Sequence, residues 1–323
     1  MAEWLYEAGL GEDRAALVED GEIIEAAIEL PGALRVGTVL AGRLAEIAPA
    51  RRRGRVETAR GDVLVEPLPP GLTEGQTVRV EIVREPLPER GRPKSARGRI
   101  TGAAECDGPS LRERVGSPRP ADPFGPDLLE AAGWSDLLDQ AASGEIPFAG
   151  GALRLSLTPA MALFDVDGSL PPAELAIRGA AACGRAIRRL GLGGSIGIDL
   201  PTLASKAERQ RAGAALDAAL PPPFERTAVN GFGFLQLVRR RERPSLPELI
   251  AADPVGAAAR ALLRRAERVG PGTLAILAAP AVVERIAAER WDAALARRAG
   301  GAVALQADPA LAISAGHVHA PQA

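Results

Sequence analysis

Short runs of alternating apolar and polar residues fill the first hundred positions of this chain. Residues 14–30 predict a β-hairpin that turns at Asp20-Gly21, since Asp-Gly accepts the positive φ angles of a tight hairpin turn. Residues 36–66 and 76–84 alternate with period 2 and are interrupted by turn residues about every eight to twelve positions. This spacing is typical of a small β-barrel.

Residues 85–125 are rich in proline, glycine and arginine, and predict an exposed connection. From residue 126 the pattern becomes one of helices between apolar strands. Helices are expected near Leu128–Ala132 and Leu137–Leu138, and over 172–190, 206–220, 254–269 and 280–298. Strands are expected at 153–157, 161–166, 195–198, 232–239, 273–278, 302–306 and 311–318. Alternating strands and helices of these lengths favour an α/β fold.

Composition narrows the class of protein. Hydrophobic residues make up 46% of the chain and charged residues 25%, which excludes a wholly disordered chain. No apolar run reaches ~18 residues, so no membrane-spanning helix is expected, and the N-terminus lacks the pattern of a secretory signal. Cys106 and Cys183 are too few for a disulfide framework or a four-thiolate zinc site. We therefore expect a cytoplasmic, reduced protein, with Cys183 packed in the core.

Charge is distributed unevenly along the chain. Residues 1–30 hold nine acids against Arg14 alone, whereas residues 31–100 hold thirteen arginines and Lys94 against eight acids. A basic segment of this kind indicates an anion-binding face, and arginine suits bidentate phosphate contacts. The alternative is a genome whose codon usage prefers arginine.

Three aspartates are the candidates for chemistry. Asp165 ends one apolar strand and Asp199 ends the next, with a helix-length crossover between them. A right-handed crossover places the carboxyl ends of two parallel strands at the same edge of a sheet, where ligands bind. Asp165, Asp167 and Asp199 are therefore expected to converge, and clustered carboxylates suit a hard divalent cation such as Mg²⁺. The alternative is that these acids cap a turn or a helix, and Asp167-Gly168-Ser169 would suit a turn.

Several stretches also carry a family resemblance. They are Leu163-Phe164-Asp165-Val166-Asp167-Gly168 within 145–169, Gly193-Gly194-Ser195-Ile196-Gly197-Ile198-Asp199 within 182–199, residues 231–246, and the opening residues 15–47. In this order they resemble the bacterial ribonuclease E/G family. The resemblance implies an acidic hairpin of an RNase H-like piece, an inserted S-one-type OB barrel, a DNase-I-like catalytic part and a small C-terminal α/β domain. The expected boundaries are 1–34, 35–85, 86–140 for a connection that replaces the family's sensor region, 141–250 and 251–323.

The resemblance further implies an endoribonuclease that cleaves single-stranded RNA with Mg²⁺. Asp165 and Asp199 match the family's metal-binding aspartates, and attack by water on the phosphodiester would leave a 5′-phosphate and a 3′-hydroxyl. Asp167 stands where the family has asparagine, so this carboxylate either joins the metal shell or lowers activity, unless it is only a turn residue.

The barrel segment lacks a base-stacking platform, because no aromatic residue lies between Tyr6 and Phe124. RNA contacts there would be electrostatic, unless the charges only face solvent. The candidate RNA-binding residues are Arg51, Arg52, Arg53, Arg55, Lys94, Arg97, Arg209, Arg211, Arg239 and Arg240.

Other family features are missing from the sequence. Nothing matches the 5′-phosphate sensor, so no 5′-end sensing is expected, and the paired cysteines of the family's zinc link are absent, so we expect no zinc and no zinc-dependent oligomer. His317 and His319 could face one side of a strand but lack a third ligand. Two alternatives to the nuclease remain: an RNA-binding family member with weak or no catalysis, and an interaction scaffold.

Overall fold

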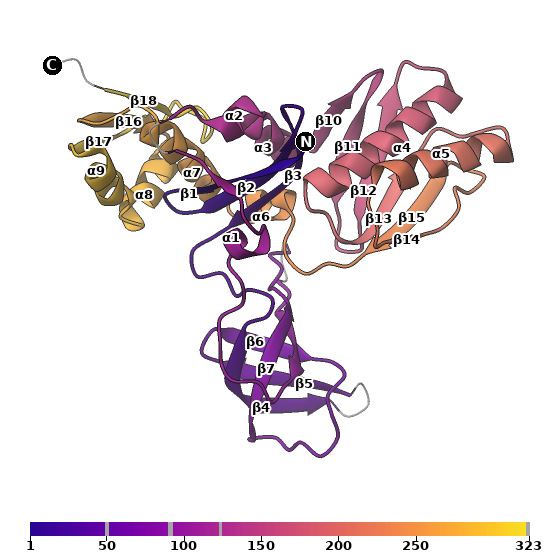
Figure 1. The fold of residues 1–323 in the computed structure, drawn as a ribbon, viewed down its shortest axis with the longest axis horizontal. Coiled ribbons are helices and arrows are strands. Elements are labelled where there is room, and N and C mark those ends of the chain that lie inside the picture. The colour runs from indigo at the N-terminus through magenta and orange to yellow at the C-terminus, as the bar shows by residue number, and fades with distance from the viewer. Residues whose placement is uncertain (49–51, 90–92, 123–124, 321–323) are drawn as a thin grey trace. The chain divides into compact units, whose positions relative to one another are not determined.

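The computed structural model describes residues 1–48, 52–89, 93–122 and 125–320 (Figure 1). The fold is mixed α/β, as the sequence predicts, and divides into two compact units. We call Met1–Gly32, Leu111–Trp134 and Ile250–Ala323 the terminal unit, and Ala33–Ser110 with Ser135–Leu249 the central unit. This division joins the two ends of the chain in one unit, whereas the sequence suggested a separate C-terminal domain at 251–323.

The first part of the terminal unit is a sheet of order β3-β2-β1-β9. Asp20 and Gly21 have φ angles of 52° and 84°, so the predicted tight turn joins β2 to β3. The elements of this part are β1 (Glu3–Ala8), β2 (Asp13–Glu19), β3 (Glu22–Glu29), α1 (Leu111–Arg114), β9 (Arg119–Pro120) and α2 (Leu128–Ala131).

The second part of the terminal unit is a sheet of order β17-β16-β18 packed against helices. The expected helix over 280–298 is two helices, because Arg290 takes a left-handed conformation with φ 56° between them. The expected strand over 311–318 is also shorter than predicted. The elements are α7 (Pro254–Glu267), β16 (Leu274–Ala278), α8 (Pro280–Ala288), α9 (Trp291–Ala299), β17 (Val303–Ala307) and β18 (His317–His319).

A closed barrel with strand order β4-β5-β6-β8-β7 belongs to the central unit (Figure 1). Alternate residues of its strands point inward, and Leu44, Val56 and Val80 are completely buried. The barrel extends beyond the expected boundary at 85, because β8 lies in the segment that the sequence suggested was an exposed connection. Its strands are β4 (Val39–Ala48), β5 (Arg53–Thr58), β6 (Gly61–Val65), β7 (Thr77–Arg84) and β8 (Ala96–Ile100).

The other part of the central unit is a six-stranded sheet of order β10-β11-β12-β13-β15-β14. Helices α4 and α5 lie along the same face of it (Figure 1). The elements are α3 (Trp134–Ser143), β10 (Glu145–Phe148), β11 (Gly151–Leu157), β12 (Ala162–Gly168), α4 (Pro172–Arg189), β13 (Gly194–Asp199), α5 (Lys206–Ala219), β14 (Glu225–Arg226), β15 (Phe234–Arg239) and α6 (Leu246–Ala252). The sequence pattern did not predict β10, β14 or α6.

The packing of α4 on this sheet depends on a small residue. A Cβ on Gly179 would lie 2.4 Å from a methyl group of Val166 on β12. Phe164 and Ile198, from the two parallel strands β12 and β13, are completely buried on the same face. The core therefore occupies the helix-covered face, and Asp165, Asp167 and Asp199 lie on the opposite face of β12 and β13.

Candidate active site on the open face of the six-stranded sheet

Five residues form one continuous row across the open face of this sheet. Their Cα atoms pair strand by strand, from Glu145 on β10 through Arg154, Asp165 and Asp199 to Phe234 on β15. Because paired residues on adjacent strands point to the same face, these side chains stand side by side, with strands about 4.8 Å apart. The row brings a guanidinium, three carboxylates and an aromatic ring into one line.

Alternation along β12 and β13 explains why Asp165 and Asp199 face solvent. Phe164 and Ile198, the residues before them, point into the core on the helix-covered face and are completely buried, so the next side chain on each strand must point the other way. Asp165 and Asp199 are both exposed. Neither has an ion-pair partner among the residues that the structure describes. These two carboxylates are therefore available to a ligand.

Asp167 has a different environment. It lies within β12 rather than in a turn, which contradicts the alternative that it is a turn residue. Its carboxylate lies 3.3 Å from Nη1 of Arg154, whose Nε is 3.3 Å from Glu145. All three side chains are more than half exposed, so these ion pairs are weak and a ligand can open them. The sequence did not single out Arg154, because its place beside Asp165 follows only from the strand register.

Asp165 and Asp199 suit a hard cation that takes only part of its ligands from the protein. Across the described parts of the chain, no three or more His, Cys, Asp or Glu side chains are grouped to hold a metal ion. The expected convergence of three aspartates thus reduces to the pair Asp165 and Asp199. Mg²⁺ commonly takes only one or two carboxylates and keeps waters or phosphate oxygens for its other positions. Two free carboxylates on neighbouring strands match this requirement.

The sheet beside the carboxylates has an apolar floor. A Cβ on Gly197 would come within 2.8 Å of the Phe234 ring and 3.0 Å of both the Leu163 and Met161 side chains. Because Gly197 has no side chain, Phe234, Leu163 and Met161 can pack directly against the backbone of β13, next to Asp199. A larger residue here would push them apart.

An exposed aromatic side chain lies at the same edge of the sheet. Phe232 is 84% exposed, and it precedes β15 by two residues. Its loop is held in shape, because Oδ1 of Asn230 accepts hydrogen bonds from the backbone N–H groups of Phe232 and Phe234 at 2.9 and 3.0 Å. Gly233 has φ 95°, and a Cβ there would lie 2.1 Å from the Leu200 carbonyl oxygen. The signal for this loop in the sequence is an aromatic residue between two glycines.

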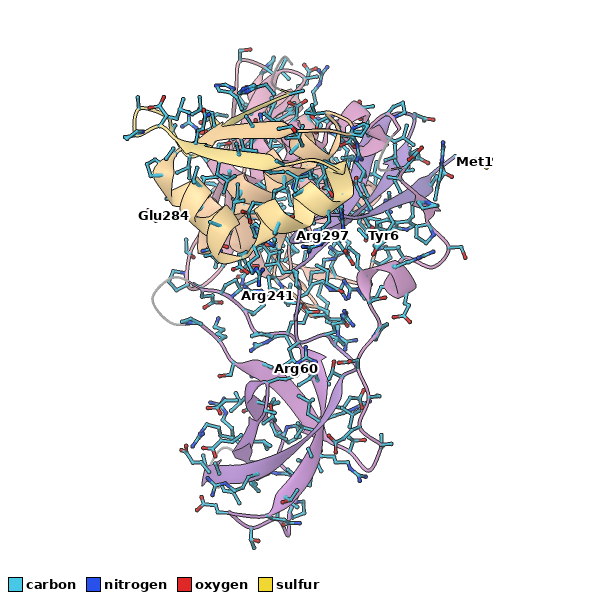
Figure 2. All side chains as sticks on the ribbon, turned by 90° about the vertical axis from the view of Figure 1, so that its left-hand side faces the viewer. Met1, Tyr6, Arg60, Arg241, Glu284 and Arg297 are labelled. Carbon is cyan, nitrogen blue, oxygen red and sulfur yellow. The ribbon has the colours of Figure 1, made fainter. Side chains whose placement is uncertain are left out.

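The basic residues of the barrel segment are largely paired with acids. Arg53 and Arg97 both contact Glu66, at 2.9 and 3.1 Å, and Lys94 contacts Glu89 at 2.6 Å. Arg55 contacts Glu46, Glu57 and Asp62, and its hydrogen bond lowers the pKa of Glu57. Arg60, labelled in Figure 2, contacts Asp107 at 3.0 Å. Arg52 is exposed, and Arg51 lies outside the described residues. The positive charge of this segment is therefore mostly balanced locally.

The remaining candidate arginines are spread over the central unit. Arg239 pairs with Gly194 at the opposite end of β13 from Asp199, roughly 17 Å away along the strand. Arg240 follows it and contacts Glu242 at 3.1 Å. The structure therefore does not bring Arg239 and Arg240 to the carboxylate row. Arg209 and Arg211 lie in the first two turns of α5, and Arg209 donates to the Leu203 carbonyl oxygen at 3.1 Å.

The histidines and cysteines of the described residues are not grouped into a further metal site. His317 and His319 lie on β18 opposite Leu277 and Ala275, and both are exposed. Cys183 is completely buried in α4, as predicted, and burial raises the pKa of its thiol. Cys106 is free and exposed.

Comparisons with known proteins assign no family to this architecture. No protein-family model matches the chain, and a search of curated proteins returns no match. None of the described helices combines the length and apolar character needed to cross a lipid bilayer.

Proposed function

We propose that this protein is a Mg²⁺-dependent endoribonuclease that cleaves single-stranded RNA, with its active site at Arg154, Asp165 and Asp199 in the middle of this row. The observation that supports this proposal most directly is the pairing of Asp165 with Asp199 on neighbouring parallel strands, with both carboxylates exposed and free of ion pairs to described residues. Carboxylates held this close repel each other unless a cation lies between them.

Three residues of the row and the nearby Phe232 have distinct roles in this proposal. Asp165 and Asp199 would hold the cation, which supplies an activated water and offsets charge on the scissile phosphate. Arg154 stands next to Asp165 and is 60% exposed, so its guanidinium can turn from Asp167 to a phosphate oxygen. Phe232 offers a ring on which a base adjoining the scissile bond can stack. Attack by water would leave a 5′-phosphate and a 3′-hydroxyl.

The fold is compatible with the ribonuclease E/G resemblance, and we propose the corresponding parts. The closed five-stranded barrel would be the OB-type RNA-binding module, the β3-β2-β1-β9 sheet the RNase H-like piece, and the six-stranded sheet the DNase-I-like catalytic part. Because Arg53, Arg55 and Arg97 of the barrel are paired with acids, RNA would have to displace exposed ion pairs to bind to them. Such pairs are worth little, and their replacement by phosphate remains salt-sensitive.

The direct test is cleavage of a fluorescent single-stranded RNA by the purified protein, with Mg²⁺ and with a chelator. The proposal expects Mg²⁺-dependent products that carry 5′-phosphate ends. Cleavage that is unchanged by the chelator, or products with 2′,3′-cyclic phosphate ends, would contradict it.

Replacing Phe232 with alanine should weaken RNA affinity about tenfold. Base–aromatic stacking contributes ~1–3 kcal/mol per base, and a tenfold change in affinity corresponds to about 1.4 kcal/mol. Fluorescence anisotropy with a short RNA would measure the change, and the loss should persist at raised salt because stacking is not ionic. The matched control is Val238→Ala, which shortens another exposed apolar side chain of the same sheet. Equal RNA affinities for the two variants would show that Phe232 does not stack on an RNA base.

Replacing Asp167 with asparagine should raise the cleavage rate roughly two- to fivefold. The substitution removes a negative charge near the row and frees Arg154 from one of its two ion pairs, and an exposed ion pair of this kind is worth ~0.2–1 kcal/mol. Single-turnover cleavage measures this effect. Asp139→Asn, at an exposed position on α3, is the control for a general change in charge. A slower Asp167 variant would show that this carboxylate serves the reaction.

A second candidate is RNA binding without efficient cleavage, and the Arg154–Asp167 pair favours it, since this pair occupies the guanidinium that stands beside Asp165 in the row. It predicts unchanged RNA affinity in the Asp165 and Asp199 variants and no metal-dependent products.

A further inference from the structure

Phe232 differs from the other aromatic residues in its exposure to solvent. It is 84% exposed, whereas the other aromatic side chains that the structure describes are all buried or half-buried. A phenylalanine ring left in water forgoes the free energy that its burial would supply. Gly231, the residue before it, has open space where a Cβ would lie, so nothing there shields the ring. Phe232 therefore presents an accessible apolar surface.

The loop that carries Phe232 is attached to the segment that follows Asp199. The N–H of Leu200 donates to the Gly233 carbonyl oxygen at 3.3 Å, and the hydroxyl of Thr202 donates to the Phe232 carbonyl oxygen at 3.4 Å. A Cβ on Gly233 would lie 2.1 Å from the Leu200 carbonyl oxygen, so the two backbones are in direct contact. These contacts keep Phe232 at the same end of the sheet as Asp199.

Asn230 fixes the shape of this loop. In addition to the two hydrogen bonds that its Oδ1 accepts from the N–H groups of Phe232 and Phe234, its own N–H donates to the Phe234 carbonyl oxygen at 2.9 Å. The N–H of Gly233 donates to the Asn230 carbonyl oxygen at 3.2 Å. A loop that is held in shape before binding loses less conformational freedom when a ligand stacks on its side chain.

The groups around the ring give little means of reading the edge of a base. Oδ1 of Asn230 accepts backbone hydrogen bonds, the hydroxyl of Thr202 donates to a backbone carbonyl oxygen, and Gly231 and Gly233 have no side chain. The strength of stacking then depends mainly on how much of the ring a base covers. A purine has two fused rings and a pyrimidine has one, so a purine gains more from stacking on Phe232.

We propose that Phe232 makes this protein prefer a purine, adenine and guanine alike, at a nucleotide that adjoins the scissile phosphate, and that Asn230 positions the ring for this contact. The inference rests on the proposed endoribonuclease function, which places the scissile phosphate at Asp165 and Asp199. It adds the class of base that the site favours and the residue that orients the stacking surface.

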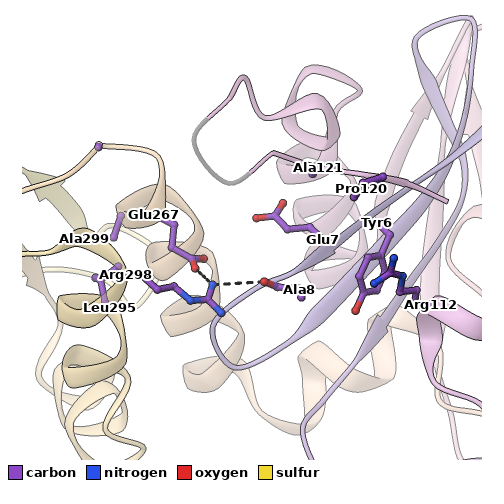
Figure 3. Close-up of a pocket in the computed structure, with 12 residues that line it drawn as sticks. Tyr6, Glu7, Ala8, Arg112, Pro120, Ala121, Glu267, Leu295, Arg298 and Ala299 are labelled. Carbon is purple, nitrogen blue, oxygen red and sulfur yellow. Dashed lines mark hydrogen bonds and ion pairs between the residues drawn. The ribbon is translucent and has the colours of Figure 1, made fainter.

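A base has a second possible place in the apolar pocket of the terminal unit (Figure 3). This pocket has a volume of about 450 Å³, within the range of small-molecule sites, and Ala8, Ala121 and Leu295 are among its lining residues. Ala121→Trp would fill it, while the backbone N–H of residue 121 can still donate to the Tyr6 carbonyl oxygen at 2.7 Å. This variant tells the two places apart, and it should leave the purine preference unchanged.

Binding of short RNAs to the full-length protein tests the preference without requiring cleavage. Fluorescence anisotropy, with a chelator present so that the RNA stays intact, compares a labelled oligouridine with the same RNA carrying one central adenine, guanine or cytosine. Adenine and guanine should each tighten binding about threefold, and cytosine should leave it unchanged. Equal affinity for all four RNAs would overturn the proposal. Selection of only one of the two purines would also overturn it, because a base edge would then be read.

Variants assign the preference to residues. Phe232→Ala and Asn230→Ala should both abolish it, whereas Asn230→Asp, which keeps oxygen atoms that can accept the two backbone hydrogen bonds, should retain it. Val238→Ala and Ala121→Trp should also retain it. A purine preference that survives in Phe232→Ala, or that is lost in Ala121→Trp, would place the base elsewhere, and one that survives in Asn230→Ala would refute the positioning role.

Mapping of the cleaved ends separates this inference from the function on which it rests. With Mg²⁺ and an RNA of random sequence, the wild-type protein should cut where a purine occupies one fixed nucleotide beside the cut, and Phe232→Ala should lose this enrichment. Cleavage without any purine enrichment would refute the inference and leave the proposed function intact. A purine preference in binding that depends on Phe232, together with no cleavage, would refute the proposed function and confine the inference to RNA binding.

Discussion

Replacing Asp199 with asparagine is expected to lower the rate of Mg²⁺-dependent RNA cleavage by about a thousandfold or more, with little effect on folding. The substitution keeps the shape of the side chain but removes one of the two charges that would hold the cation. A bound metal contributes several kcal/mol of transition-state stabilisation, and each 1.36 kcal/mol is a factor of about ten in rate. Because Asp199 is exposed at the end of β13 and has no ion-pair partner in the described chain, its neutralisation leaves no buried charge unpaired.

Single-turnover cleavage at saturating protein separates this loss from an effect on RNA binding. Asp165→Asn should reduce the rate to a similar extent, and the double variant should be no worse than either single variant, since both carboxylates serve the same ion. Asp139→Asn is the matched control. Wild-type cleavage by the Asp199 variant would refute the assignment of the active site, and full activity of the double variant would place the reaction elsewhere on the chain.

Replacing Glu12 with alanine is expected to destabilise the terminal unit by ~3–5 kcal/mol. The Glu12 side chain is 2% exposed and accepts hydrogen bonds from two buried guanidiniums, from Arg260 at 3.0 Å and from Arg264. Burial lowers the pKa of Arg264, which shows how poorly its charge is solvated. Removal of the carboxylate would leave both guanidiniums buried without their main counter-charge, and this penalty exceeds the value of the original ion pairs.

The three tryptophans report on this unit directly, because Trp4, Trp134 and Trp291 all lie within it. Urea unfolding followed by tryptophan fluorescence would therefore measure the change in free energy of unfolding. Glu22→Ala, at the exposed start of β3, is the control and should change stability by no more than about 0.5 kcal/mol. A Glu12 variant as stable as this control would show that the buried charges find other partners.

The sequence predicted helices, strands and turns well wherever a few neighbouring residues are enough to favour one local conformation. The Asp20-Gly21 turn, the period-2 alternation of the barrel strands, and the helix over 172–190 that starts at Pro172 are all confirmed. The errors fall where local pattern is ambiguous: the apolar periodicity over 280–298 continues through Arg290, although the backbone there breaks the helix.

Local sequence pattern was also an incomplete guide to the candidate site. Asp165 and Asp199 could be identified from the sequence, because each ends an apolar strand and a crossover of helical length joins the two. Arg154 could not be identified in this way, since nothing near it in the sequence relates it to Asp165. Only the antiparallel pairing of β11 with β12 places the two residues side by side. Arg239 and Arg240 appeared equivalent to the other arginines, yet the antiparallel direction of β15 carries them to the far end of the sheet.

By itself, the sequence determined the types of element, the barrel, and the two aspartates at strand ends, because hydrophobic periodicity and turn chemistry act over a few neighbouring residues. Only the tertiary structure decided which side chains share a face or a cavity. The contact between Glu12 and Arg260 joins residues 248 positions apart, and Glu267 lines a pocket with Tyr6 and Arg112 from distant segments. These arrangements depend on strand register and on helix packing across the whole chain, and no local pattern contains either.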